Sequence, residues 1–353
     1  MSQVCEEVAS LIRDKIRSGE WQAGFKLPVR TELISLLNSN NYTIQNAIKQ
    51  LEEEGYLTVG ARKSGTRVSE SPPHSSSYYL IFPEEVNHWG YFWKALAEEA
   101  QKKSDTSCQI KCVHRINHLN SINDVQKMIA NVQNKSVAGL IFTSSADEFI
   151  NTPLLDTPGI PRVAISYPNR LPGIPKIKLG LEDFIDQAVA HLVAQGRKKL
   201  AILSPDTNIA NRFIKASKTH RLQVNNAWIQ FPRLGLKESS RNTVEMILSP
   251  IHTHRPDGLI IADDNLIEGA VEWLSNSKLS FPDDLSIVTL NNFPHTVPCN
   301  IPTTRFGFNI PSLLEMLISR LQDVSKGKKI VENTTLTAVQ EIDFKTQDSN
   351  KNL

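Results

Sequence analysis

The stretch "NYTIQNAIKQLEEEGYLTVGARKSGTRV", residues 41–68, predicts a helix followed by a small hairpin. Its apolar residues recur at the i, i+3, i+4, i+7 spacing of a helix with one buried face: Ile44, Ala47, Ile48 and Leu51. Asn40 or Asn41 can cap the start of this helix, and Gly55 ends it. Two β-prone pieces, "YLTV" and "TRVSE", then flank the basic loop "GARKSG", whose glycines favour a hairpin.

Two further helices are predicted upstream of this stretch. The first carries apolar residues at helical spacing from Val4 to Ile16 and ends near Gly19. The second starts behind Pro28. Its buried side consists of three residues: Leu33, Ile34 and Leu37. Three helices followed by a hairpin are typical of a winged helix-turn-helix, so we expect an α+β domain of this kind over residues 1–69.

The rest of the chain has a different pattern of polar and apolar residues. The segment "SESPPHSSS", residues 69–77, is polar and lacks periodicity, which predicts a linker at residues 70–77. Beyond it, short apolar runs such as "YYLIF", "VAGLIF" and "GLIIA" alternate with helical patterns. Strands that are apolar on both faces and are separated by helices indicate a parallel sheet covered on both sides. We therefore expect an α/β domain over residues 78–345 and a tail at residues 346–353.

Composition is consistent with two domains of an ordinary globular protein. The length of 353 residues exceeds that of most single domains, and 40% of the residues are hydrophobic and 22% charged. Charged residues occur throughout the first twenty positions, and no later run is long enough for a transmembrane helix. We therefore expect a cytoplasmic protein that is not associated with a membrane.

Metal binding is an alternative for one cysteine-containing segment. Cys108 and Cys112 precede His114 and His118, a set of residue types that can bind zinc. Cys112, however, lies in the strand-like run "QIKCVHRI", where alternation explains an inward cysteine without a metal. We expect no metal and no cofactor, and we interpret the four cysteines as reduced thiols.

Residues 18–68 resemble the GntR family of bacterial transcription regulators. The shared landmarks are a Ser-Gly, a Gly before Leu-Pro, the run Leu-Glu-x-Glu-Gly and the run Gly-Thr-x-Val. The resemblance implies that the basic hairpin is a wing that touches phosphate or the minor groove of DNA. The chain departs from the family at Val29 to Thr31, where Ser-Glu-Arg is usual. It departs again at Asn40 and Asn41, where a Ser-Arg pair commonly opens the recognition helix.

The outer face of the third helix is expected to read base edges. Asn and Gln side chains can bond bidentately to adenine, which predicts some preference for A·T pairs. The residues expected to contact DNA, from the helix-turn-helix and from the wing, are Arg30, Asn41, Tyr42, Thr43, Gln45, Asn46, Lys49, Arg62, Lys63, Ser64, Gly65 and Arg67.

The body, from about Tyr78 to Phe344, resembles the effector domain of the LacI family, which shares its fold with periplasmic sugar-binding proteins. The segments that carry the likeness are "LVAQGRKKLAILSPD", "PDGLIIADDNLIEGAVEWL", "FPDDLSIVTLNN" and "IPTTRFGFN". A GntR-like head on a LacI-like body is the combination of the arabinose-repressor type. The resemblance implies a two-lobed, periplasmic-binding-protein-like α/β domain with a ligand cleft at the carboxyl ends of its strands.

The same resemblance implies which side chains face that cleft. Asp264 and Arg212 match family positions, and Asn291 stands where an Asp is common. The expected ligand-binding residues are Trp89, Tyr91, Phe92, Thr143, Ser144, Asp206, Arg212, Asp264 and Asn291. Two alternatives stay open, because packing explains the three aromatic residues equally well and helix capping explains Asp264. The family's Asp before the central helix has no counterpart, since Gly180 or Leu181 stands there.

No catalytic motif accompanies these features. The chain has no Gly-x-Ser-x-Gly elbow, Walker loop, His-Glu-x-x-His pair or Rossmann glycine fingerprint, so we do not expect an enzyme. We expect a sequence-specific DNA-binding transcription regulator, a repressor, controlled by a sugar or sugar derivative. Its partners would be a palindromic operator in double-stranded DNA, the carbohydrate effector and a second copy of the chain. The alternative is a constitutive DNA-binding or partner-binding dimer with a degenerate sensor cleft.

Overall fold

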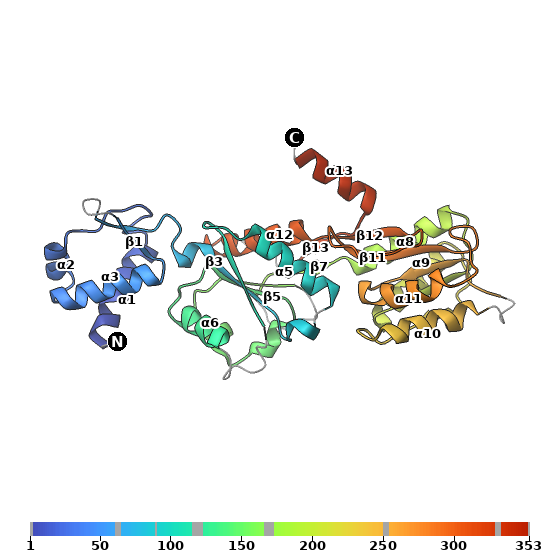
Figure 1. The fold of residues 1–353 in the computed structure, drawn as a ribbon, viewed down its shortest axis with the longest axis horizontal. Helices are drawn as coiled ribbons and strands as arrows, with labels where there is room; N and C mark the ends of the chain where they lie inside the picture. The colour runs from blue at the N-terminus through green and yellow to red at the C-terminus, as the bar shows by residue number, and fades with distance from the viewer. Residues whose placement is uncertain are drawn as a thin grey trace.

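The protein is described by a computed structural model that covers residues 3–60, 65–88, 90–114, 123–165, 173–249, 254–328 and 333–351. Three units follow one another along the molecule: an N-terminal winged helix, an N-terminal lobe and a C-terminal lobe (Figure 1). Within the described residues, no helix is both long and apolar enough to cross a membrane.

The winged helix consists of three helices and a two-stranded hairpin, as predicted. Its elements are α1 (Gln3–Arg17), α2 (Arg30–Leu36), α3 (Asn41–Glu53), β1 (Leu57–Val59) and β2 (Thr66–Val68). The two strands are antiparallel, with Leu57 opposite Val68. The helical stripes meet in one buried core that includes Ile12, Leu33 and Ile44.

A buried arginine forms an ion pair that links α1 to the end of α3. Arg13 is almost fully buried and bonds Glu54 through Nε at 2.8 Å and Glu6 through Nη2 at 2.9 Å. Burial opposes the charge of the guanidinium, but the two carboxylates outweigh that effect and raise the pKa of Arg13 further. The long first helix therefore orients the recognition helix through charge as well as apolar packing.

The N-terminal lobe is a six-stranded parallel sheet in the order β13-β7-β6-β5-β3-β4. Its strands are β3 (Ser77–Ile81), β4 (Gln109–Val113), β5 (Gly139–Phe142), β6 (Arg162–Ile165), β7 (Lys176–Leu179) and β13 (Asn333–Leu336). Helices α5 (Tyr91–Lys103) and α12 (Ile310–Ser325) cover one face, and α6 (Asn123–Gln133) and α7 (Pro153–Asp156) cover the other. Side chains of β5 are buried on both faces, which explains its unbroken apolar sequence.

The C-terminal lobe repeats this plan with the order β14-β12-β11-β10-β8-β9. Its strands are β8 (Leu200–Leu203), β9 (Ile229–Gln230), β10 (Gly258–Ile261), β11 (Ser286–Phe293), β12 (Thr304–Asn309) and β14 (Val339–Gln340), of which β14 alone is antiparallel to its neighbour. Helices α8 (Leu181–Ala194) and α9 (Thr207–Thr219) cover one face, and α10 (Lys237–Leu248) and α11 (Ile267–Ser275) cover the other. The two-lobed α/β prediction is confirmed.

Within the described residues, the chain crosses between the lobes three times. It passes from β7 into α8, from β12 into α12, and from β13 into β14. The first and third crossings lie side by side, because the Gly180 amide donates to the Leu336 carbonyl at 2.8 Å. A short connection of this kind lets two lobes rotate while each sheet stays intact.

Two segments carry more structure than the sequence predicted. The predicted linker contains a short helix, α4 (Pro73–Ser76), which leads directly into β3 at Ser77. The predicted tail lies mostly in α13 (Glu341–Lys351), which projects from the body in Figure 1. Phe344 of α13 stacks on Phe293 at 5.2 Å between ring centroids, which anchors the start of the helix.

Candidate DNA-binding surface and effector site

The recognition helix α3 is started by an asparagine cap. Asn40 accepts a hydrogen bond from the Thr43 amide at 2.9 Å, so Asn41 is the first helical residue. Tyr42 is 75% exposed and Gln45 and Lys49 are exposed. Asn41 and Arg30 are exposed as well, and Asn46 is half-buried. These six side chains leave one polar side of the helix-turn-helix open to a partner.

The expectation for Thr43 is wrong in one respect. The sequence predicts Thr43 on the outer face of α3, but only 6% of it is exposed. It lies one turn before the fully buried Ala47, and residues four apart on a helix share a face. Thr43 therefore supports the helix start, and the polar outer face begins with its neighbour Tyr42.

The wing is described only in part. Gly65 is exposed and has φ +75°, a conformation that favours glycine at the end of the hairpin loop. The Arg67 side chain is exposed but donates to the Gly24 carbonyl at 2.9 Å, and the segment before α2 pairs with β2 at Lys26. Arg62, Lys63 and Ser64 lie outside the described residues.

A small interface connects the winged helix to the N-terminal lobe. The Tyr56 hydroxyl lies 3.1 Å from the Ser136 hydroxyl, across two different units of the fold. The Tyr56 ring stacks on His74 of α4 with centroids 5.8 Å apart and planes inclined by 6°. Burial is the main reason that the pKa of His74 falls to about 4, helped by the charge of Arg17. The region predicted as a linker therefore contacts the winged helix through a neutral, half-buried histidine and continues into the N-terminal lobe at Ser77.

The two lobes meet at the carboxyl ends of their strands, which we call the interlobe edge. Helix α5, which follows β3, contacts the C-terminal lobe at its first residue. The Tyr91 amide donates to Asn265 Oδ1 at 3.1 Å, and the Tyr91 hydroxyl lies 3.4 Å from Glu268. At Gly90 a Cβ atom would lie 2.8 Å from that Asn265 oxygen, so the close approach depends on glycine. The edge therefore brings residues of both lobes together.

Asp264 is the most deeply buried carboxylate at this edge. It is 4% exposed, begins the short 3-10 helix η5 (Asp264–Leu266) and accepts a hydrogen bond from the Asn292 amide. Burial, with a contribution from neighbouring Asp263, raises the pKa of Asp264 to about 8. The cap of η5 is Asp263, whose Oδ1 accepts from the Asn265 amide at 2.9 Å. Asp263 is thus the N-cap of η5, and Asp264 also accepts from the Asn265 backbone amide, so capping explains part of the environment of both aspartates.

The end of β5 supplies two further hydroxyls. Thr143 is fully buried and its hydroxyl donates to the Ile81 carbonyl at 2.8 Å. The Ser144 hydroxyl is also buried, yet it has no hydrogen-bond partner among the described residues. A buried hydroxyl without a partner costs free energy that a bound ligand or water can recover. Ser144 is thus better suited than Thr143 to contact a ligand.

Three predicted ligand residues have their polar groups engaged within the chain. Asp206 caps α9 by accepting from the Asn208 and Ile209 amides at 2.7 and 3.0 Å. Arg212 forms an ion pair with Asp186 of α8 and lies 3.9 Å from Glu182. Asn291 donates to the Thr289 hydroxyl at 2.9 Å and accepts from the Val297 amide at 3.2 Å. A ligand that contacts any of these three side chains would share or replace its present partner.

Asn292, rather than Asn291, is the β11 residue beside Asp264. The strand continues to Phe293, so successive residues point to opposite faces of the sheet. Asn291 follows the face of Ile287, and Asn292 follows the face of Val288. The two consecutive asparagines in "VTLNN" mark this position in the sequence. Nothing in the sequence favours Asn292 over Asn291 as the residue beside Asp264.

The aromatic residues of the first loop separate into different roles. Phe92 packs against the core beneath α5, and Tyr91 packs against the apolar cluster of the C-terminal lobe. Trp89 lies outside the described residues. The packing alternative therefore accounts for Phe92, whereas Tyr91 belongs to the interlobe edge.

A histidine adds a second contact across the edge. His295 follows β11, and its Nδ1 lies 3.0 Å from Glu98 and its Nε2 lies 2.7 Å from Glu99, both on α5. Burial opposes the charge of Glu99, but Lys102 and His295 outweigh it and lower the pKa of Glu99. Sequence reasoning missed His295, because no motif connects it to residues nearly two hundred positions earlier.

No group of three or more His, Cys, Asp or Glu side chains in the described part of the chain is arranged to hold a metal ion. The described residues at the interlobe edge instead offer hydroxyl, amide and carboxyl groups together with the Tyr91 ring. Such groups suit a small polar molecule that offers several hydrogen-bonding positions.

Comparison with protein families divides the chain in the same way. Residues 5–68 match the family of bacterial regulatory proteins called the gntR family, and residues 189–343 match the periplasmic binding protein-like domain. The chain therefore joins a GntR-type helix-turn-helix domain to a periplasmic-binding-protein-like domain, as predicted. This pair of domains defines the chain as a DNA-binding transcription regulator.

Individual relatives agree with that class. The chain is 24% identical to the arabinose metabolism transcriptional repressor of Geobacillus stearothermophilus, over 91% of this chain and 94% of the relative. It is 23% identical to an HTH-type transcriptional regulator of Lachnoclostridium phytofermentans, over 42% of this chain and less than half, 46%, of that protein. These relatives are transcription regulators, which are not enzymes.

Solved structures support the fold of the body. A LacI family transcriptional regulator from Lactobacillus casei with bound glucose superposes with a TM-score of 0.57 at 16% identity, covering 75% of this chain and 98% of that one. A regulatory protein of the LacI family from Chloroflexus aggregans gives 0.56 at 17% identity, covering 76% and 96%. At these identities the likeness concerns the fold alone.

Proposed function

We propose that this protein is a transcription repressor whose affinity for operator DNA is controlled by a small molecule bound at the interlobe edge. The observation that carries the proposal is the physical connection of the parts. A helix-turn-helix with an exposed polar face is packed, through Tyr56, His74 and Ser136, onto a two-lobed domain. A change in the angle between the lobes can therefore change the position of α3.

The proposed mechanism is thermodynamic linkage. A ligand that binds one arrangement of the lobes better than the other shifts the population toward it. In a dimer, this shift alters the spacing of two recognition helices and their fit to the half-sites of a palindromic operator. Reciprocity follows, so a ligand that weakens DNA binding tenfold must itself bind DNA-bound protein tenfold more weakly.

A carbohydrate is the effector that we favour. The interlobe edge offers the Ser144 hydroxyl, which has no partner among the described residues, the Asp264–Asn292 pair and the Tyr91 ring. Sugars present many hydroxyls and an apolar ring face, which such groups can bind. The name of the Geobacillus stearothermophilus relative points in the same direction. The protein would act in the cytoplasm, where its operator lies.

A second candidate is a constitutive DNA-binding dimer that has lost its ligand. The observation that favours it is the internal engagement of Asp206, Arg212 and Asn291. Under this hypothesis, the interlobe contacts hold one permanent arrangement and no small molecule changes DNA affinity.

A thermal-shift screen followed by DNA-binding titrations separates the two candidates. Purified full-length protein would be heated with monosaccharides, sugar phosphates and short oligosaccharides. A ligand at one hundred times its dissociation constant adds about 2.7 kcal/mol to the free energy of unfolding. The hit would then be added to the protein on its operator, identified by selection from random duplexes.

The expected result is one saturable ligand whose stabilising effect is lost in Ser144→Val and kept in Lys326→Ala, an exposed position just after α12. That ligand should also change the dissociation constant for the operator. Specific operator binding with no response to any compound would support the constitutive candidate. Absence of specific DNA binding would overturn both.

A further inference from the structure

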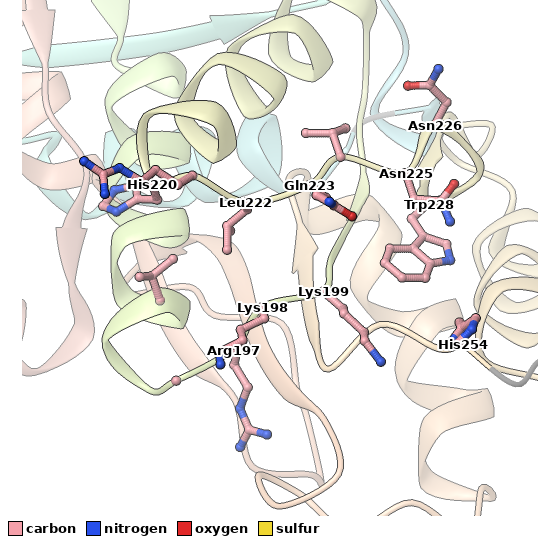
Figure 2. A pocket seen from close by; sticks show the side chains of 14 residues that line it. Arg197, Lys198, Lys199, His220, Leu222, Gln223, Asn225, Asn226, Trp228 and His254 are labelled. Carbon is pink, nitrogen blue, oxygen red and sulfur yellow. The ribbon is translucent and has the colours of Figure 1, made fainter.

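A cavity of about 1030 Å³ lies in the C-terminal lobe, far from the interlobe edge. Fourteen residues line it (Figure 2), and we call it the distal cavity. Lys199 directly precedes β8, Trp228 directly precedes β9, and His254 lies shortly before β10. The cavity therefore opens at the amino ends of the strands, whereas the proposed effector lies at their carboxyl ends.

The distal cavity is strongly basic. The described side chains that line it include four permanent cations and two histidines: Arg197, Lys198, Lys199, Arg221, His220 and His254. None of the lining residues within the described ranges is acidic. The whole chain has a formal net charge of only +2, so this is a local concentration of positive charge. Cavities of one sign focus the electrostatic field and attract ions of the opposite sign.

Local structure accounts for part of this charge. Helices α8 and α9 end at this side of the lobe, and cations stabilise the partial negative charge of helix carboxyl termini. The Arg197 guanidinium donates to the carbonyls of Pro282 and Asp283 at 2.6 and 2.9 Å, so it is held in place. The partial negative charges of two helix ends and two carbonyl groups sum to less than the four positive charges of the arginine and lysine side chains. A net positive charge therefore remains at the cavity.

The nearby carboxylate of Asp257 offsets one of these positive charges, and its hydrogen bonds to this segment go to the backbone. Asp257 accepts hydrogen bonds from the backbone amides of Lys198 and Lys199, between 2.8 and 3.2 Å. Its oxygens hold the backbone, and both lysine side chains remain exposed. Asp257 thus positions the two lysines at the cavity, an arrangement suited to phosphate oxygens.

The other end of the distal cavity has a different chemistry. Trp228 lines the cavity together with Asn225, Gln223, Lys199 and His254, whereas Asn226 points away from the indole in Figure 2. Trp228 is half-buried, and an indole face stacks on planar rings. Carboxamides can donate and accept hydrogen bonds along the edge of a base. The cavity volume is at the upper end of the range for small-molecule sites.

We propose that the distal cavity binds a nucleotide, with its phosphates on Lys198 and Lys199 and its base against Trp228. The cations supply attraction for the phosphates, and the indole with its neighbouring amides supplies a platform for the base. A nucleotide is favoured over an inorganic anion because the cavity is larger than one phosphate and contains an aromatic end. This second ligand would be independent of the effector at the interlobe edge.

Isothermal titration calorimetry on the full-length protein tests the proposal. The probes are ATP, AMP, ribose 5-phosphate and inorganic phosphate at about physiological salt. We expect saturable binding of ATP or AMP, at least tenfold tighter than that of ribose 5-phosphate, which lacks the base. Lys198→Ala/Lys199→Ala should weaken nucleotide binding at least tenfold, and Lys326→Ala, in the other lobe, should leave it unchanged.

Further variants address the base and the location. Trp228→Leu keeps an apolar side chain and should reduce the affinity for AMP to that of ribose 5-phosphate. Ser144→Val at the interlobe edge should leave AMP binding unchanged. The proposal is overturned by the absence of saturable nucleotide binding, or by binding that survives the double lysine substitution. Equal affinity for AMP and ribose 5-phosphate would also overturn it, because Trp228 would then not hold a base.

Discussion

Asp264 is a buried carboxyl group whose protonation state differs between the folded and the unfolded chain. In the folded chain burial and the neighbouring Asp263 raise the pKa of Asp264 to about 8, whereas an unfolded aspartic acid titrates near 3.9. Between these values the folded state binds more protons than the unfolded state, so stability falls as pH rises toward 8. The proton lowers the cost of burying the carboxyl group beside Asn292.

Replacing the carboxyl group by an amide should remove this pH dependence. Asp264→Asn keeps the shape of the protonated acid and an acceptor for Asn292. We expect the melting temperature of the variant to exceed that of the native protein by an amount that grows from about pH 5 to about pH 8.5, because only in the native protein does unfolding release the proton of Asp264, a release that rising pH favours. The underlying free energy is on the order of a few kcal/mol. Glu245→Gln, at an exposed position of α10, is the control. A difference that stays constant with pH would contradict the raised pKa.

Gln45 and Lys49 lie on the same helix but should affect DNA binding differently. Gln45→Ala should weaken operator binding by about 1–3 kcal/mol through the loss of one base contact, because a side-chain amide can hydrogen-bond to a base edge. Preferences at the other base positions should change little. Lys49→Ala should weaken binding to all DNA sequences about equally, because an ammonium group contacts phosphate. The slope of log affinity against log salt concentration should fall by about one. Titrations against single-base operator variants measure both. A uniform loss for Gln45→Ala would show that it is not a base reader.

At the scale of elements, the sequence predicted helices and strands better than the orientation of single side chains. The stripe from Ile44 to Leu51 has helical period, so the buried face of α3 could be predicted. Strand β11 is buried on both faces, so no alternation in its sequence separates Asn291 from Asn292. That choice depends on which face meets the loop after β10, and only the fold defines it.

Ion pairs and contacts between domains could not be predicted from the sequence either. Arg212 occupies a position that the LacI resemblance associates with ligand, but its carboxylate partners lie on α8, a separate helix. The polar composition of residues 70–77 predicted a linker, because serine and proline are common in linkers. In the structure Ser76 and Ser77 are almost fully buried, since the neighbouring units enclose them.

The contact of Tyr56 with Ser136 gives this junction a testable role. Tyr56→Phe keeps the ring that stacks on His74 but removes the hydroxyl that bonds Ser136. We expect a loss of about 1 kcal/mol in stability, the usual contribution of one hydrogen bond, and faster proteolysis between residues 69 and 76. Ser136→Ala should have the same effect, and the double variant should add little to either. Fully additive losses would show that the two hydroxyls act separately.

At the scale of the whole molecule, helix α5 is the element that joins the lobes at their edge. It starts at Tyr91, which contacts Asn265 and Glu268, and two turns later Glu98 and Glu99 contact His295. Both contacts cross from one lobe to the other. A rotation that opens the edge breaks these contacts of α5. Their strength therefore contributes to the balance between the arrangements that a ligand selects.

His295→Ala should shift that balance without touching the proposed ligand. The substitution leaves Glu98 and Glu99 on α5 but removes their common partner in the C-terminal lobe. If the ligand prefers joined lobes, its dissociation constant should rise on the order of tenfold, which corresponds to about 1.4 kcal/mol of lost interlobe contact. DNA affinity without ligand should change much less than the ligand response. Lys102→Ala is the matched control, because Lys102 pairs with Glu99 within α5 and does not reach the other lobe. Calorimetry with the effector and X-ray scattering of the free protein measure affinity and lobe separation. Equal effects of both substitutions would mean that Glu99 acts within its helix and that the bridge to His295 does not control the lobes.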